Sequence, residues 1–235
     1  MKERSHSNNL ISISGVKGSG KDLTANMFQY CLSVPKAFRQ YWLYKMFHKI
    51  VPKRYQILAF ADPVKRMLSV LLNVPVNRFF DRDFKEKWTI NIPTLELYDE
   101  ALNDRLSDSK FNKLVKNLDP TLTTSKLSIR QLMQYFATQI MQTYFTRRVW
   151  INCTLRHTDK KTIISDLRFK EEFEAIKERN GICIYVQRPN YMFGEHASEK
   201  EMSELLYNDE YDYVINNSGS IKDLFNKIKE ISYDL

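Results

Sequence analysis

Short apolar runs alternate with helix-like segments at the start of the chain. Residues 10–14 form an apolar run, residues 15–20 are rich in glycine, and residues 21–33 carry helical spacing. A second apolar run at 57–60 precedes Asp62-Pro63, where proline suits the first position of a helix. The pattern therefore predicts strand, glycine turn and helix, followed by a second strand and helix.

The same alternation returns in the last third of the chain. Apolar runs at 162–165, 182–186 and 213–215 predict strands, and the segments 171–179, 199–207 and 221–231 predict helices. Strands that alternate with helices are typical of a parallel sheet covered on both faces. The fold class predicted is α/β, with the parallel sheet flanked by helices.

The middle of the chain shows no comparable alternation. Residues 76–125 predict helical segments and loops, and 128–144 predict a strong amphipathic helix that Ser128 caps. We expect an N-terminal tail at 1–9 and one domain at 10–235. Within that domain we expect a basic and aromatic insertion at 35–55 and a mainly helical acceptor or lid region at 76–150.

Composition places the chain among soluble globular proteins. Of its 235 residues 43% are hydrophobic and 27% are charged, and its three cysteines have no paired spacing. The start lacks a signal-peptide pattern, and no apolar stretch approaches the roughly 20 residues of a membrane span. We therefore expect a cytoplasmic protein with reduced thiols and no membrane association.

The net charge of +8 indicates an anionic partner. Two interpretations stay open, because an enzyme that handles phosphates needs surplus lysine and arginine, and so does a protein that binds nucleic acid. We favour the phosphate-handling enzyme. For the cations among aromatic residues at 36–54 we favour a lid or a contact between subunits of a homodimer, with binding of single-stranded nucleic acid as the alternative.

The glycine turn matches the first seven positions of the phosphate-binding loop, or P-loop. In this pattern backbone N–H groups cradle phosphate oxygens, the following helix presents its positive end, and a lysine reaches the terminal phosphates. The loop predicts ATP binding and consists of Gly15, Val16, Lys17, Gly18, Ser19, Gly20 and Lys21. Its position after an apolar strand and before a helix is the context that the motif requires.

The next residue departs from the motif. The pattern calls for serine or threonine to contact Mg²⁺, and this chain has Asp22. A carboxylate is a hard oxygen ligand that binds Mg²⁺ directly or through water. We therefore expect Asp22 to take part in holding Mg²⁺.

Further short motifs occur in the order found in the phage-type deoxynucleoside monophosphate kinases, which this chain resembles. The loop ends GSGKD, as theirs does. The other matching segments are Phe60 to Lys65, Arg130 to Gln134 with Ala137-Thr138, Ile164 to Phe169 with Glu172, His196 to Glu199, and Tyr213 to Asn217. Ala137, Gln139 and the 35–55 insertion depart from the family pattern. The resemblance implies a P-loop kinase that uses ATP and Mg²⁺ to phosphorylate a deoxynucleoside monophosphate, in the cytoplasm or in that of a virus-infected host.

Several residues near strand ends are candidates for phosphate chemistry. Asp166 ends a predicted strand, where open α/β sheets bind ligands, and either holds Mg²⁺ or caps a helix. Arg168 either neutralises phosphate or pairs with Glu171 or Glu172. Together with Lys21 they form the predicted catalytic set. Arg188 either covers the adenine or transferring phosphate, or is a solvated loop residue.

The acceptor side is predicted from the resemblance and from charge. Asp62 and Lys65 open a helix and are expected beside the acceptor. Arg130 is expected to grip the monophosphate as a planar guanidinium fork, with Arg147 and Arg148 as alternatives. The further candidates are Gln134, Thr138 and Trp150, the last either stacking a base or packing in a core.

Two alternative functions remain open. One is a kinase of another small phosphate ester, since phosphomevalonate kinase also resembles this chain at the GSGKD loop. The other is a nucleic-acid-associated P-loop ATPase, which the charge of +8 favours.

Overall fold

A computed structural model describes residues 10–93, 124–142, 144–156, 158, 161–189 and 197–235. The predicted tail at 1–9 and His196 lie outside these residues. The chain forms two compact units, unit 1 from residues 1–61 and 151–235, and unit 2 from residues 62–150. Each unit is described by itself.

Unit 1 is built on a five-stranded sheet in the order β2-β5-β1-β6-β7. Every neighbouring pair in this sheet is parallel, as predicted. The strands are β1 (Leu10–Ser14), β2 (Gln56–Leu58), β5 (Thr162–Leu167), β6 (Ile182–Gln187) and β7 (Tyr213–Asn216). Strands buried on both faces need continuous apolar runs, and β1 and β6 have them.

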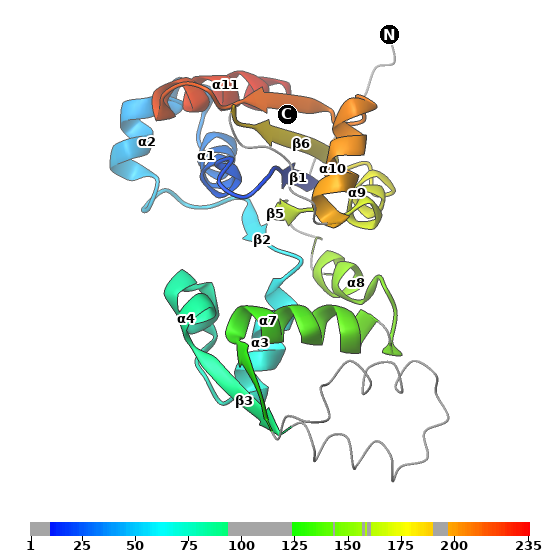
Figure 1. Ribbon diagram of the computed structural model, residues 1–235. Helices are drawn as coiled ribbons and strands as arrows, with labels where there is room; N and C mark the ends of the chain where they lie inside the picture. The colour runs from blue at the N-terminus through cyan, green and yellow to red at the C-terminus, as the bar shows by residue number, and fades with distance from the viewer. Residues whose placement is uncertain (1–9, 94–123, 143, 157, 159–160, 190–196) are drawn as a thin grey trace. The chain divides into compact units, whose positions relative to one another are not determined.

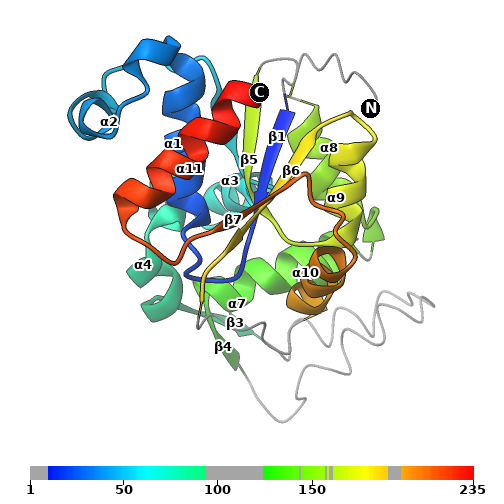
Figure 2. The same ribbon diagram turned by 90° about the horizontal axis from the view of Figure 1, so that it is seen from above.

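Helices cover both faces of this sheet. Figures 1 and 2 show α1 (Lys21–Ser33) and α11 (Ile221–Asp234) on one face, with α9 (Lys170–Lys177) and α10 (Ala197–Tyr207) on the other. Successive strand residues point their side chains to opposite faces of the sheet and so contribute to two separate cores. Ile11 and Ile163 pack under α1 and α11, while Ile164 and Tyr185 pack under α9 and α10. The predicted α/β fold with a P-loop between β1 and α1 is confirmed.

The predicted insertion at 35–55 folds against α1 and α11. It contains the short 3₁₀ helix η1 (Lys36–Phe38) and the helix α2 (Tyr41–Phe47). Tyr44 packs its ring against those of Tyr30 and Phe225, and the buried Arg39 donates to the carbonyl oxygen of Ser232 at 2.6 Å. Figure 2 shows α2 at the end of α1 opposite to the P-loop. The segment therefore does not cover the loop as a lid.

Unit 2 has its own apolar core. Its elements are α3 (Asp62–Leu71), η2 (Val76–Phe80), α4 (Arg82–Lys87), β3 (Thr89–Pro93), β4 (Thr124–Ser128), α7 (Ile129–Gln134) and the π-helical segment η3 (Tyr135–Gln142), followed by α8 (Val149–Leu155) at the boundary with unit 1. The core includes Leu68, Phe79, Phe84, Leu132 and Trp150. The expectation of a helical middle region thus agrees with most of the described elements.

Two features of unit 2 differ from the prediction. An antiparallel pair of strands, β3 and β4, stands where loops and helix were expected. The paired residues are more than 30 positions apart in the chain, so no local sequence pattern predicts the pairing. The predicted Ser128 cap is confirmed, with Gln131 completing a capping box, but the α-helix ends at Gln134 and continues as a π-helix. Apolar spacing over eight residues does not separate these two helix types.

We predict that Phe225→Ala lowers the free energy of unfolding by about 3–5 kcal/mol. The Phe225 ring is fully buried against Tyr30, Tyr41 and Tyr44, so the change leaves a cavity between α11 and the 35–55 segment. Ile221→Ala on the same helix is the control, because that side chain is 54% exposed. Urea denaturation measures both variants, and equal losses would contradict this account of the packing.

Candidate active site

The P-loop begins where β1 ends and requires glycine at two tight positions. Gly15 has a φ of +153°, and a Cβ there would lie 2.7 Å from the carbonyl oxygen of Val186. Gly20 has a φ of +97°, and a Cβ there would lie 2.7 Å from the amide nitrogen of Asn217. Side chains at either position would push the loop away from β6 and β7. The glycines thus allow the loop to sit directly against the sheet edge.

Two side chains from neighbouring strand ends hold the loop. Asn217, which follows β7, donates its amide N–H to the carbonyl oxygen of Ser19 at 2.8 Å. Arg188, which follows β6, donates to the carbonyl oxygen of Gly18 at 3.1 Å. Since a trans peptide points its C=O and N–H in opposite directions, the Gly20 N–H points away from Asn217. These contacts orient the loop for an anion.

Asn217 is itself fixed by the sheet. Its backbone N–H donates to the carbonyl oxygen of Gln187 at 2.7 Å, which extends the pairing of β6 and β7 by one bond. Asn217 belongs to one of the segments that resemble the family pattern, but no role was predicted for it. Its position directly after a short apolar strand was the signal available, because parallel strands end at the ligand edge of a sheet.

Four charged side chains gather at this edge. Burial lowers the pKa of Lys21, the neighbouring Asp22 and Asp166 carboxylates raise it, and the Arg168 guanidinium lowers it. Asp22, Asp166 and Arg168 therefore lie within electrostatic reach of Lys21. Arg168 is exposed, and its positive charge also opposes the rise in the pKa of Glu172.

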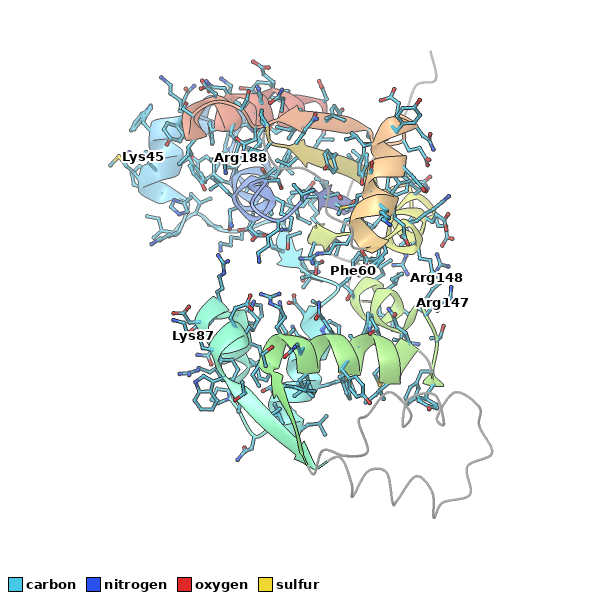
Figure 3. All side chains as sticks on the ribbon, in the orientation of Figure 1. Lys45, Phe60, Lys87, Arg147, Arg148 and Arg188 are labelled. Carbon is cyan, nitrogen blue, oxygen red and sulfur yellow. The ribbon has the colours of Figure 1, made fainter. Side chains whose placement is uncertain are left out.

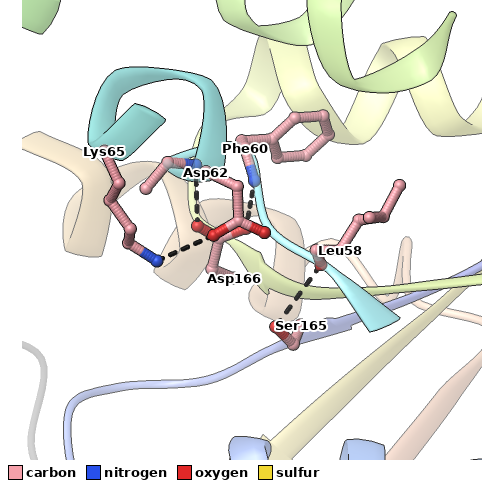
Figure 4. Close-up of polar contacts among 7 residues, drawn as sticks. Leu58, Phe60, Asp62, Lys65, Ser165 and Asp166 are labelled. Carbon is pink, nitrogen blue, oxygen red and sulfur yellow. Dashed lines mark hydrogen bonds and ion pairs between the residues drawn. The ribbon is translucent and has the colours of Figure 1, made fainter. Parts of the chain in front are cut away.

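Asp166 ties two strand ends together. Its carboxylate accepts the backbone N–H of Phe60 at 2.7 Å and that of Ala61 at 3.2 Å (Figure 4). This contact fixes the segment that leaves β2. It is not the helix cap considered as the alternative role, since Glu172 takes that place.

Glu172 is a residue of α9, and its side chain caps the N-terminal end of that helix. Its carboxylate accepts the backbone N–H of Arg168 at 2.7 Å and that of Phe169 at 3.1 Å. Burial raises the pKa of Glu172 to about 8, the Asp166 carboxylate raises it too, and the two backbone N–H groups oppose the rise. Glu172 therefore holds the backbone that presents Arg168.

The predicted acceptor residues all lie in unit 2. Lys65 forms an ion pair with Asp62 at 2.8 Å (Figure 4), and its ammonium group lies 4.2 Å from the centre of the Phe80 ring. Arg130 donates from Nε to a carboxylate oxygen of Glu86 at 2.8 Å. Both predicted cations are thus held in defined positions by acidic partners.

The remaining candidates of unit 2 differ in exposure. Gln134 and Thr138 are exposed, and the Thr138 hydroxyl donates to the carbonyl oxygen of Gln134 at 2.7 Å. Trp150 is only 6% exposed, and its indole N–H donates to the carbonyl oxygen of Ala137 at 3.0 Å. The structure places Trp150 in the core, which was the second of its two predicted roles. Arg147 and Arg148 follow η3 (Figure 3).

Within the described residues, no group of three or more Asp, Glu, His or Cys side chains is arranged to enclose a metal. None of the described helices combines the length and the apolar character that crossing a bilayer requires.

We predict that Asn217→Ala raises the KM for ATP about tenfold, because loss of its hydrogen bond frees the Ser19 peptide. Thermal stability should change little, since the side chain is at the surface edge of the sheet. Asn216→Ala is the matched control, because that neighbouring side chain is exposed. Steady-state kinetics with varied ATP measure the effect. An equal KM for ATP in both variants would contradict a role for Asn217 in the site.

Comparison with known proteins assigns the chain to a family. The family model for deoxynucleotide monophosphate kinase matches residues 70–228. The deoxynucleotide monophosphate kinase of Enterobacteria phage T4 is 25% identical, over 94% of this chain and 97% of its own length. That of Escherichia phage RB69 is 23% identical, over 94% of this chain and 98% of its own.

A solved structure, dephospho-CoA kinase from Campylobacter jejuni, covers 97% of this chain and 96% of its own. It is 14% identical with a TM-score of 0.36, a likeness on which no argument is based. The family match covers about two thirds of the 235 residues, and both phage relatives match nearly the whole chain. The chain therefore belongs to the deoxynucleotide monophosphate kinase family.

Proposed function

We propose that this chain transfers the γ-phosphoryl group of ATP to a deoxynucleoside monophosphate and forms ADP and a deoxynucleoside diphosphate. The single observation that carries this proposal is the P-loop of a family member, held against the sheet edge with Lys21, Asp166 and Arg168 beside it. Phosphoryl transfer needs positioning and charge neutralisation more than covalent chemistry. The described site offers both.

The ATP phosphates are bound by the loop. Backbone N–H groups between Gly15 and Gly20 and the first turn of α1 supply donors and the positive end of the helix. Lys21 extends from that turn toward the terminal phosphates. Burial lowers its pKa because the ammonium is partly desolvated, and a phosphate would restore the lost solvation. Arg188 adds charge from the end of β6 while it holds the Gly18 carbonyl.

Mg²⁺ fits the carboxylates at this edge. The cation is commonly held by one or two carboxylates together with substrate phosphates and water, and does not need an enclosed protein site. Asp22 is exposed, Asp166 lies near the end of β5, and the charges of both act on Lys21. These two residues would hold Mg²⁺, directly or through water. When bound, Mg²⁺ would neutralise charge on the transferring phosphate.

The acceptor is assigned to unit 2. Arg130 carries two terminal NH₂ groups besides the Nε that Glu86 occupies, so the guanidinium can still present donors to a dianionic phosphate. Asp62, Lys65, Gln134 and Thr138 are the other proposed contacts. Trp150 supports them from the core rather than by stacking a base, because its N–H and its ring are both engaged there.

The reaction needs no general base. A monophosphate oxygen is already anionic at neutral pH, so the attacking atom carries no proton that must be removed. Arg168 and Lys21 would stabilise the charge that moves onto the bridging and terminal oxygens during transfer. The protein's task is to bring two highly charged phosphates into line.

We predict that purified protein forms ADP when given ATP, Mg²⁺ and a deoxynucleoside monophosphate, and that Lys21→Ala abolishes this activity. Lys21 touches the site and not the core, so the variant should keep its thermal stability. Lys200→Ala is the matched control, since that lysine is exposed on α10, on the far face of the sheet from α1.

A coupled assay for ADP measures this, with the four deoxynucleoside monophosphates, phosphomevalonate and single-stranded DNA as separate additions. Turnover only with phosphomevalonate would favour the other small-phosphate kinase. Hydrolysis that only DNA stimulates would favour a nucleic-acid-associated ATPase. Substantial activity in Lys21→Ala would contradict the role given to the loop.

We predict that Arg130→Lys raises the KM for the deoxynucleoside monophosphate about tenfold or more while the KM for ATP changes less than about twofold. The substitution keeps the charge and removes the planar fork. Arg82→Lys, at an exposed position of α4 in the same unit, is the control. Unchanged acceptor kinetics would move the phosphate-gripping role to Arg147 or Arg148.

A further inference from the structure

The outer side of the 35–55 segment exposes apolar side chains at a regular interval. Phe38, Trp42, Met46 and Ile50 follow one another every four residues, and they are 55%, 59%, 64% and 74% exposed. Trp42 and Met46 lie on α2, Phe38 lies on η1, and Ile50 follows α2. Several large apolar side chains exposed on so short a segment mark a binding surface. We call this row, together with the cations beside it, the α2 face.

The inner side of the same segment accounts for its packing. Tyr41 and Tyr44 point to the core and contact Phe225, and Tyr44 also contacts Tyr30. Tyr41 and Tyr44 therefore anchor the segment on α1 and α11, whereas the rings of Phe38 and Trp42 are exposed.

Lysines run beside the exposed row. Lys45 is exposed on α2, and Lys49 and Lys53 are exposed in the segment that follows this helix. With about 100° per residue, Lys45 lies on one side of Trp42 and Met46 on the other. Figure 3 labels Lys45 on α2. The cation of the helix therefore lies next to Trp42, and two further cations follow in the chain.

The charge of the segment has one sign. No Asp or Glu occurs between Asp22 and Asp62, whereas residues 36–54 contain six Lys or Arg residues. The rest of the chain then carries a formal charge of only +2, against +8 for the whole. Of the six, Arg39 is buried and bonded to Ser232. The excess positive charge of this protein is therefore concentrated on the α2 face and its border.

The α2 face is separate from the P-loop. It follows the C-terminal end of α1, and the 13 residues of that helix span about 20 Å. The strand that leaves the segment, β2, begins at the edge of the sheet opposite to the P-loop, because the strands are parallel. A ligand on this face would not occupy the phosphate site.

We propose that the α2 face binds single-stranded DNA. A single strand offers bases that stack on aromatic side chains and phosphates that attract cations, and this face exposes the rings of Phe38 and Trp42 together with Lys45, Lys49 and Lys53. A second copy of the chain would bring two strongly basic faces together, at a cost in repulsion. An amphipathic segment that lies on a bilayer carries its cations opposite the apolar stripe, whereas here Lys45 lies next to Trp42.

The test is fluorescence anisotropy of a labelled 20-nucleotide oligo(dT), with excess ADP and Mg²⁺ present to occupy the P-loop. Three phosphate contacts, one for each of the three lysines, would weaken binding about twentyfold between 50 and 200 mM salt. Lys45→Glu with Lys49→Glu should flatten the logarithmic salt slope by about 1.4. Trp42→Ala should weaken binding about fivefold or more and leave that slope unchanged, because a ring contributes stacking and no charge.

The matched control substitutions are at residues outside the α2 face. Tyr207→Ala removes an aromatic ring that is 91% exposed on α10, and Arg156→Glu with Lys200→Glu makes the same charge change as the lysine pair. Both controls should bind oligo(dT) within about twofold of wild type. Melting temperatures and kinase activity should stay near wild type in every variant.

Four results would overturn the proposal. The first is no binding of oligo(dT) at low salt, and the second is equal losses in Tyr207→Ala and Trp42→Ala. The third is equal affinity for duplex DNA, which would show attraction to any polyanion. The fourth is a Trp42-dependent dimer in sedimentation, or Trp42-dependent binding to vesicles with 30% phosphatidylserine, without oligo(dT) binding. Either form of the fourth result would identify a different occupant.

Discussion

The parallel register of unit 1 is the constraint on which the candidate active site depends. Ser14 pairs with Leu167 and with Tyr185, and Gln187 pairs with Asn216, so β1, β5, β6 and β7 all end at one edge. The residues that follow these four strands are the P-loop, Arg168, Arg188 and Asn217. The P-loop, Arg168, Arg188 and Asn217 therefore meet although they are far apart in the chain, as residues of ligand sites in open α/β sheets do.

Hydrogen bonds to backbone groups hold this edge in place. Asn217 and Arg188 donate to carbonyl oxygens of the loop, Asp166 accepts from the segment after β2, and Glu172 accepts from the backbone at Arg168. Each charged or amide side chain thus satisfies main-chain groups that the turn after a strand leaves without partners. Asp166 combines this structural bond with the proposed metal contact.

Unit 1 separates its two basic regions by the length of one helix. The N-terminal end of α1 carries the phosphate loop with the partly buried Lys21. The C-terminal end leads to the α2 face, where the lysines are exposed. The net charge of +8 therefore combines cations at the P-loop end with cations of the α2 face. Only the P-loop end is needed for the proposed transfer.

The sequence by itself determined the elements of unit 1 and the identity of the P-loop. Apolar runs and helical spacing located every strand and most helices of that unit within a few residues, because burial on both sides of a sheet leaves little freedom in composition. The glycines and Lys21 identified the loop, because each of these positions meets a local steric or electrostatic requirement. The resemblance to a kinase family rested on the same local segments.

The tertiary structure decided everything that depends on pairs far apart in the chain. It joined Asn217 to Ser19 and Asp166 to Phe60, and it paired β3 with β4 across more than 30 residues. It also sorted the aromatic residues of the 35–55 segment into anchors and exposed rings, and Trp150 into a core. No local pattern encodes these outcomes, because a residue's partner is chosen by the whole fold and not by its neighbours in sequence.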